Sequence, residues 1–151
     1  FAACQNSQTA PTTALPTMIP IPTRVLITPE AQEIQKVTDA IMQKYQAWET
    51  GNWDAFYEAL HSDSKKLISK TDFAQYWNIK RTSFPITNPQ VRDIRFFQTV
   101  THPELNKTYN NVAEVMVKYD QQISDKPITT QDGLNFLTKE NGQWKILWKA
   151  S

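Results

Sequence analysis

The fold is decided near the end of the chain, where residues 134–148 have the sequence LNFLTKENGQWKILW. Two runs rich in large apolar residues flank Asn141-Gly142, a dipeptide favoured in two-residue hairpin turns because both residues tolerate a positive φ. The stretch therefore predicts an antiparallel hairpin whose register is fixed by its turn. The expected cross-strand pairs are Glu140 with Gln143, Leu137 with Ile146, and Phe136 with Leu147.

Upstream of this hairpin, apolar residues recur with helical spacing. The longest pattern begins at Thr28-Pro29-Glu30, where Thr28 is a candidate N-cap and Pro29 suits the first helical position. It ends at Gly51, a residue that favours helix termination. The apolar stripe, with spacings of three and four residues, consists of Ile34, Val37, Ile41, Tyr45 and Trp48.

The rest of the chain predicts two shorter helices and then strands. One helix is expected after a cap at Asn52, and the next after a cap within residues 69–71. The period then changes, and residues 90–100, 111–122 and 134–149 are rich in β-branched and aromatic residues. Helices followed by antiparallel strands indicate an α+β fold, in which a long N-terminal helix and two shorter helices pack on the sheet.

The composition limits the kinds of partner and cofactor. The chain has 16 Lys and Arg against 15 Asp and Glu, and this net charge of +1 gives no long-range attraction for nucleic acid. No stretch approaches the roughly 18 consecutive apolar residues of a membrane-spanning helix. The chain has a single cysteine and no His-x-His pair, so it has no pattern typical of a metal site. It also has only three glycines and no glycine-rich phosphate-binding loop. We therefore expect no nucleic-acid partner, no metal and no cofactor.

The cysteine, Cys4, follows Ala2-Ala3 and precedes a segment rich in Gln, Ser, Thr and Pro. Small residues directly before a cysteine resemble the end of a bacterial lipoprotein signal peptide, whose cysteine becomes the lipidated first residue of the mature protein. We expect residues 1–28 to be a disordered leader and spacer that tethers a folded domain, residues 29–151, to a membrane. The expected location is the periplasmic or extracellular side of a bacterial membrane. The alternative is an unmodified cysteine in a frayed terminus.

Two motifs resemble the nuclear transport factor 2-like superfamily. They are YQAWETGNWDAFY at residues 45–57 and NGQWKI at residues 141–146. In that superfamily a long helix ends at a glycine, a short helix begins with an aromatic residue and an acid, and the last hairpin ends in a similar strand. The resemblance covers about residues 29–150 and implies a strongly bent antiparallel sheet, wrapped round the long helix as a cone with a pocket. It selects no function, because that fold hosts isomerases, dehydratases, transport factors and binding domains.

Few residues are candidates for acid–base chemistry. His61 and Asp63 follow the second expected helix and are candidates for a general base and its orienting carboxylate, as in dehydratases of similar fold. The structural alternative is a histidine that contacts the last carbonyls of that helix. His102 lies in an expected loop, and solvent-facing ion pairs across strands explain Asp93 and Glu114. No residue is therefore assigned a catalytic role.

The closing hairpin is apolar on both faces, whereas a half-solvated sheet would have one polar face. Leu134, Phe136 and Leu147 form the second apolar set. Because the helices cover only the concave side, we expect these three residues to contribute to a subunit or partner contact. The competing cover is the N-terminal part of the chain, either residues 18–22 or residues 25–27.

These observations favour a non-catalytic lipoprotein domain that binds a partner protein, as an accessory subunit of a membrane or envelope complex or as a homo-oligomer. Two alternatives stay open: a domain that holds a small apolar ligand in the cone, and an isomerase- or dehydratase-like enzyme that uses the pocket. An exposed apolar strand face favours partner binding, and an empty cavity favours ligand binding. An isolated buried acid or histidine at the pocket mouth favours the enzyme.

Overall fold

The turn at Asn141 and Gly142 is present in the computed structural model, which describes residues 24–151. Both turn residues have a positive φ, 51° and 76°. They join β4 (Thr129–Glu140) to β5 (Gln143–Leu147) in antiparallel register. The sequence-based register is confirmed, because the pairs include Glu140 with Gln143, Leu137 with Ile146, and Phe136 with Leu147.

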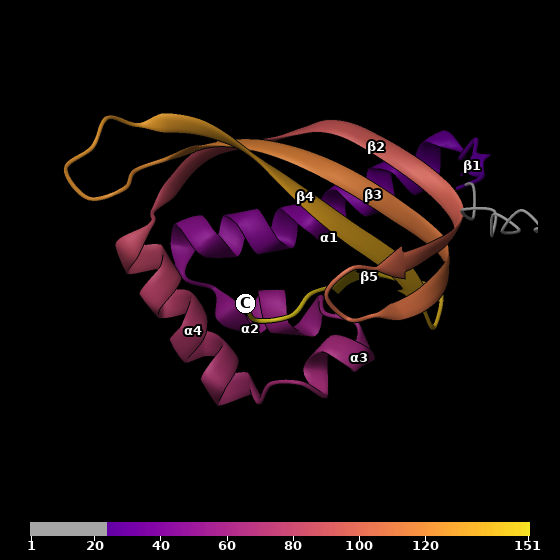
Figure 1. Ribbon diagram of the computed structural model, residues 1–151, viewed down its shortest axis with the longest axis horizontal. Coiled ribbons are helices and arrows are strands. Elements are labelled where there is room, and N and C mark those ends of the chain that lie inside the picture. The colour runs from indigo at the N-terminus through magenta and orange to yellow at the C-terminus, as the bar shows by residue number, and fades with distance from the viewer. Residues whose placement is uncertain (1–23) are drawn as a thin grey trace, which may run out of the picture.

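Within the described residues, five strands form one antiparallel sheet in the order β1-β2-β3-β4-β5. The other three strands are β1 (Leu26–Ile27), β2 (Ile86–His102) and β3 (Lys107–Gln121). The sheet is strongly curled, and Figure 1 shows β2, β3 and β4 arching over α1. The α+β class and the bent antiparallel sheet expected from the sequence are therefore present.

Strand β1 lies in the part of the chain that was expected to be spacer. Leu26 and Ile27 pair with Phe97 and Phe96 at the edge of the sheet. The sheet thus begins three residues before the expected domain boundary at Pro29. Residues 1–23 of the expected leader, Cys4 among them, lie outside the described part of the chain.

Four helices occur within residues 24–151, and their caps follow local sequence. Their bounds are α1 (Ala31–Thr50), α2 (Trp53–Glu58), α3 (Ser62–Lys65) and α4 (Lys70–Ser83). Gly51 ends α1 with a φ of 83°, and Asn52 caps α2 by accepting a hydrogen bond from the Ala55 N–H. Ser69 caps α4 in the same way. The expected cap at Thr28 is wrong, because Glu30 occupies the N-cap of α1, and the short helix α3 was not expected.

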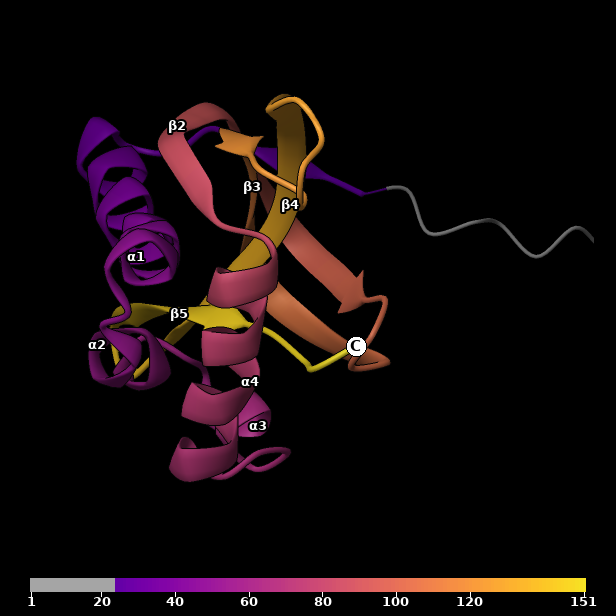
Figure 2. The same cartoon turned by 90° about the vertical axis from the view of Figure 1, so that its left-hand side faces the viewer.

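The main core lies between the helices and the sheet, and Figure 2 shows the helices together on one side of the strands. The buried face of α1 contributes Val37, Ile41, Tyr45, Ala47 and Trp48. Aromatic rings from α1, α2 and α4 pack edge-on against one another, with Trp48 and Trp77 5.1 Å apart between centroids. Such pairs add about 0.5–1.5 kcal/mol each beyond the area that they bury.

A second, smaller core lies where the ends of β2 and β3 curl back toward β5 (Figure 1). Its buried members are Phe97, Val100, Tyr109, Val112, Phe136 and Leu147. This corrects the expectation for the closing hairpin, because Phe136 and Leu147 are only 6% and 4% exposed. Their cover is the β2–β3 pair, which was not considered as a cover from the sequence. Leu134 alone of the expected interface set is exposed, at 50%.

Candidate functional site

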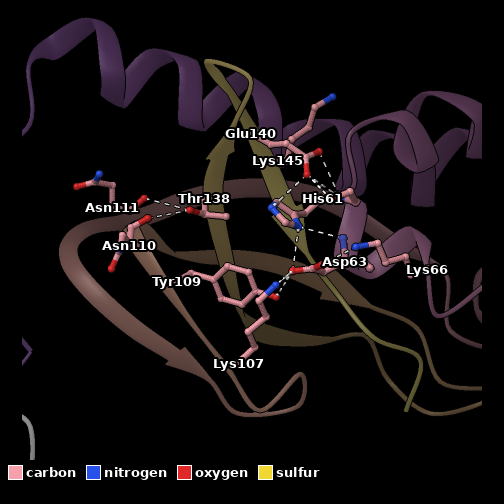
Figure 3. A network of polar contacts seen from close by, with 12 residues as sticks. His61, Asp63, Lys66, Lys107, Tyr109, Asn110, Asn111, Thr138, Glu140 and Lys145 are labelled. Atoms are coloured by element: carbon pink, nitrogen blue, oxygen red, sulfur yellow. Dashed lines mark hydrogen bonds and ion pairs between the residues drawn. The ribbon is translucent and has the colours of Figure 1, made fainter.

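The two acid–base candidates from the sequence do come together, as Figure 3 shows. His61 is the N-cap of α3, where its Nδ1 accepts a hydrogen bond from the Asp63 N–H at 3.1 Å. Its Nε2 lies 3.4 Å from Oε2 of Glu140, a partner that the sequence reasoning did not identify. The expected contact with the last carbonyls of the preceding helix is wrong, because the ring begins the next helix.

The carboxylate of Asp63 is already bonded to other side chains. It accepts hydrogen bonds from Lys107 Nζ at 2.6 Å, from the Tyr109 hydroxyl at 3.0 Å and from Lys66 Nζ at 3.3 Å (Figure 3). The bond from Lys107 is the main reason that the pKa of Asp63 falls to about 2. Burial and the bond to Asp63 raise the pKa of Tyr109. This network fastens α3 to β3, and neither His61 nor Asp63 lines the cleft described next.

A cleft of about 300 Å³ lies between α1, the middle of β4, the β2–β3 turn and the last residues of the chain. Its apolar wall is formed by Leu134, Phe136, Leu147 and Trp148. The three residues that the sequence indicated as an interface are thus brought together, but as the wall of a cleft. The volume is at the lower end of the range for ligand sites, about 300–1,000 Å³.

Lys44 lines this cleft, as do the polar residues His102, Glu104, Asn135, Lys149 and Ser151. Its ammonium donates a hydrogen bond to Asn135 Oδ1 at 2.7 Å and lies 5.3 Å and 5.8 Å from the ring centroids of Tyr45 and Trp77. Within residues 24–151 no carboxylate forms an ion pair with it. Burial lowers the pKa of Lys44 to about 8, and the negative charge of Glu104 opposes the shift. The lysine is therefore a partly exposed cation near Glu104 that forms no ion pair within residues 24–151.

Asn135 orients the Lys44 side chain by accepting a hydrogen bond from its ammonium. The amide is 4% exposed, and its nitrogen donates to the Tyr45 hydroxyl at 2.9 Å and to the Gly133 carbonyl at 3.1 Å. These bonds identify which end of the amide is the nitrogen, so its oxygen must face Lys44. The Lys44 ammonium has two further hydrogens that this bond does not use.

The sequence reasoning missed Lys44, although a signal was present. Lys44 lies three residues after Ile41 and four before Trp48, and so falls on the apolar stripe of α1. A lysine at that position places its charge next to the core. An ionisable residue inside a buried stripe would have identified Lys44 as a candidate site residue.

The other titratable candidates are occupied elsewhere. Glu114 is not solvent-facing as expected, because it is 7% exposed and lies 2.8 Å from Arg24 and 3.4 Å from Arg95. Asp93 forms an exposed pair with Arg95, at 3.1 Å. His102 is buried at the β2–β3 turn, and its Nδ1 accepts hydrogen bonds from two backbone N–H groups. Loss of water lowers the pKa of His102.

The described part of the chain contains no group of three or more His, Cys, Asp or Glu side chains placed to hold a metal ion. None of its helices combines the length and the hydropathy that crossing a membrane requires. Comparison with known proteins found no matching family model and no matching curated protein. The resemblance to the nuclear transport factor 2-like superfamily therefore stays a prediction.

Proposed function

We propose that this chain is a non-catalytic, membrane-tethered binding domain whose cleft holds a small organic anion with an apolar tail. One observation carries the proposal. Lys44, without an ion-pair partner in residues 24–151, lines a cleft whose lining also includes the apolar side chains of Leu134 and Trp148. A carboxylate placed there supplies the missing counter-charge, and its tail covers the exposed part of Leu134.

The energetics of the lysine favour an anion over a neutral ligand. With a pKa of about 8, Lys44 is mostly protonated at pH 7, so it presents a charge that burial has made costly. Charge-assisted hydrogen bonds from such a group are roughly twice as strong as neutral ones. Binding of an anion removes part of the desolvation cost, whereas a neutral ligand leaves it in place.

The alternatives have less support from the contacts. A partner-protein contact through Phe136 and Leu147 lacks the exposed surface it needs, because both side chains are buried. An enzyme based on His61 and Asp63 lacks free groups, because both side chains hold structural hydrogen bonds away from the cleft. The small-ligand hypothesis is supported in altered form, with a polar head added to the expected apolar ligand.

The membrane tether is part of the same proposal. Its support is Ala2-Ala3-Cys4 followed by a Pro-rich segment, and all of these residues precede Arg24, the first described residue. Two or three acyl chains would anchor the domain stably, since each buried CH₂ contributes about 0.8 kcal/mol. Intact-mass analysis of native protein tests the tether: lipid on Cys4 supports it, and an unmodified thiol contradicts it.

A cone-shaped domain of the nuclear transport factor 2 type also belongs to the proposal. Its support is the curl of the sheet over α1 and a cleft that lies beside both. In such a cone the open mouth admits a small ligand, while the sheet and helices form a rigid wall around it.

Calorimetric titration with hexanoate and hexanamide tests the binding function. The two compounds have similar shape and differ in charge, so a preference for hexanoate measures the contribution of the ammonium. We expect hexanoate to bind at least tenfold more tightly than hexanamide, and Lys44→Met to abolish that preference. Lys126→Met, in the exposed turn between β3 and β4, is the matched control and should change neither affinity. Equal affinities in the wild type, or an unchanged preference in Lys44→Met, would contradict the proposal.

A further inference from the structure

We propose that Lys44 also acts as a nucleophile, forming a reversible imine with a small aldehyde or ketone held in the same cleft. This inference rests on the proposed function in one respect, because the carbonyl compound must enter the cleft that the organic anion occupies. It adds covalent chemistry that anion binding does not require.

The geometry presents the amine to a ligand. Lys44 lines a cleft that apolar side chains also line, and its Nζ donates one hydrogen to Asn135 Oδ1 at 2.7 Å. That bond leaves the remaining hydrogens, and in the neutral amine the lone pair, free to face a bound molecule. Leu134 and Trp148, which line the same cleft, can pack against the carbon chain of a ligand. The reacting carbon and the nitrogen are thereby held together, which lowers the entropic part of the barrier.

The charges around the amine support the same chemistry. Burial lowers the pKa of Lys44 to about 8, so roughly 10% of the side chain is neutral at pH 7, against on the order of 0.03% for an ordinary lysine. Glu104 and His102 from the β2–β3 turn and Lys149 line the same cleft, and the Tyr45 ring of α1 lies 5.3 Å from the Lys44 ammonium. Glu104 opposes the shift, and burial outweighs it.

The reaction balances without a cofactor. The lone pair of the Lys44 nitrogen attacks the carbonyl carbon, and the nitrogen gives up a proton as the carbonyl oxygen becomes a hydroxyl. The resulting carbinolamine loses that hydroxyl, with a second proton, as water, and a carbon–nitrogen double bond forms. Addition of water reverses both steps. Desolvated lysines in apolar pockets are suited to this chemistry because their neutral form is populated near pH 7.

Other lysines of the chain provide internal references. Lys149 lines the same cleft but is exposed, and Lys126 is exposed in the β3–β4 turn and does not line the cleft. The low pKa also reduces the intrinsic nucleophilicity of Lys44, which offsets part of the several-hundredfold gain in neutral amine. We therefore expect a net advantage of about tenfold over these two lysines.

Reductive trapping with hexanal and sodium cyanoborohydride at pH 7 tests the inference. The reagent adds hydride to the imine and converts it to a stable secondary amine, which peptide mass mapping locates. Lys44 should be labelled about tenfold faster than Lys149 and Lys126, with a rate that stops rising near pH 8. Labelling of Lys44 no faster than that of Lys149 would overturn the inference.

Lys44→Arg separates the inference from the proposed function. Arginine keeps the positive charge but has no amine of suitable reactivity, so the variant should retain the preference for hexanoate and lose the fast labelling. If wild-type protein prefers hexanoate but shows no fast labelling, the imine inference fails and anion binding stands. If Lys44 is labelled rapidly while hexanoate and hexanamide bind equally, the anion-binding proposal is contradicted and the imine inference is supported. Circular dichroism of each variant confirms that the fold is kept.

Discussion

Replacing Lys44 with methionine should remove a pH dependence of folding stability that the cleft imposes on the wild type. Burial lowers the pKa of this lysine from an ordinary 10.5 to about 8. Between these values the unfolded chain holds more protons than the folded chain, so the free energy of unfolding rises as the pH rises. The full shift would add about 2 kcal/mol between pH 7 and pH 9.5. Because the side chain is partly exposed to solvent, we expect about 1–2 kcal/mol.

Methionine has a similar length and carries no charge, so Lys44→Met should lack this rise. At pH 7 it also removes the desolvation cost but leaves Asn135 Oδ1 without its donor, which costs about 1 kcal/mol. The variant should therefore be as stable as the wild type at pH 7, or slightly more stable. Above pH 10 the raised pKa of Tyr45 and of Tyr109 acts in the opposite direction, so the comparison stops at pH 9.5.

Urea unfolding of both proteins at several pH values between 7 and 9.5 measures the effect. The difference between the two curves isolates Lys44, because every other titrating group is shared. Lys126→Met serves as the control for loss of an exposed lysine and should follow the wild type at every pH. Parallel curves for wild type and Lys44→Met would refute the reasoning, since they would mean that the folded state leaves this amine as well hydrated as the unfolded state does.

Three further predictions concern the stability of the fold. Gly133→Ala should lower the free energy of unfolding by about 1–3 kcal/mol, because the added methyl group collides with the Tyr45 hydroxyl. If urea unfolding shows no loss of stability, the Tyr45 hydroxyl must lie elsewhere. Phe136→Ala should lower the free energy of unfolding by about 3–5 kcal/mol, in a protein that stays monomeric on gel filtration. If the variant instead dissociates an oligomer without loss of monomer stability, the partner-interface hypothesis would be favoured. Asp63→Asn should lower the free energy of unfolding by about 1–2 kcal/mol at pH 7. This difference from the wild type should vanish as the pH falls through about 2, because a carboxylate with a lowered pKa stabilises the fold only while it is charged. A difference that persists at pH 2 would contradict this reasoning.

Local patterns were sufficient for much of the fold. The Asn141-Gly142 turn fixed the register of the last hairpin because a two-residue turn leaves one way to pair its flanks. Gly51, Asn52 and Ser69 were found because their roles depend on neighbours three or four residues away. Strand β1 was missed, since two residues at a sheet edge carry no periodic signal and depend on pairing with β2.

The site was harder to predict, because it depends on contacts between distant parts of the chain. Asn135 and Lys44 are 91 residues apart in sequence and 2.7 Å apart between Oδ1 and Nζ. The curl of β2 and β3 decides whether Phe136 and Leu147 are surface or core, and no local pattern reports that curl. Phe136 and Leu147 are buried in the second core, where the sequence reasoning expected a partner contact, while Leu134 is exposed. His61 and Asp63 were recognised as neighbours, but the other partner of His61, Glu140, is set by the position of the final turn.

The most direct test of the cleft is the pKa of the Lys44 side chain, measured by NMR from the ¹³Cε shift as a function of pH, with and without hexanoate. The lysine resonance that is missing in Lys44→Met identifies the group. The free protein should show Lys44 titrating near pH 8, and saturating hexanoate should raise that value by a unit or more, because a bound carboxylate favours the charged amine. Hexanamide should not raise it. A Lys44 that titrates with the exposed lysines, or whose pKa is the same with and without hexanoate, would contradict the anion-binding function.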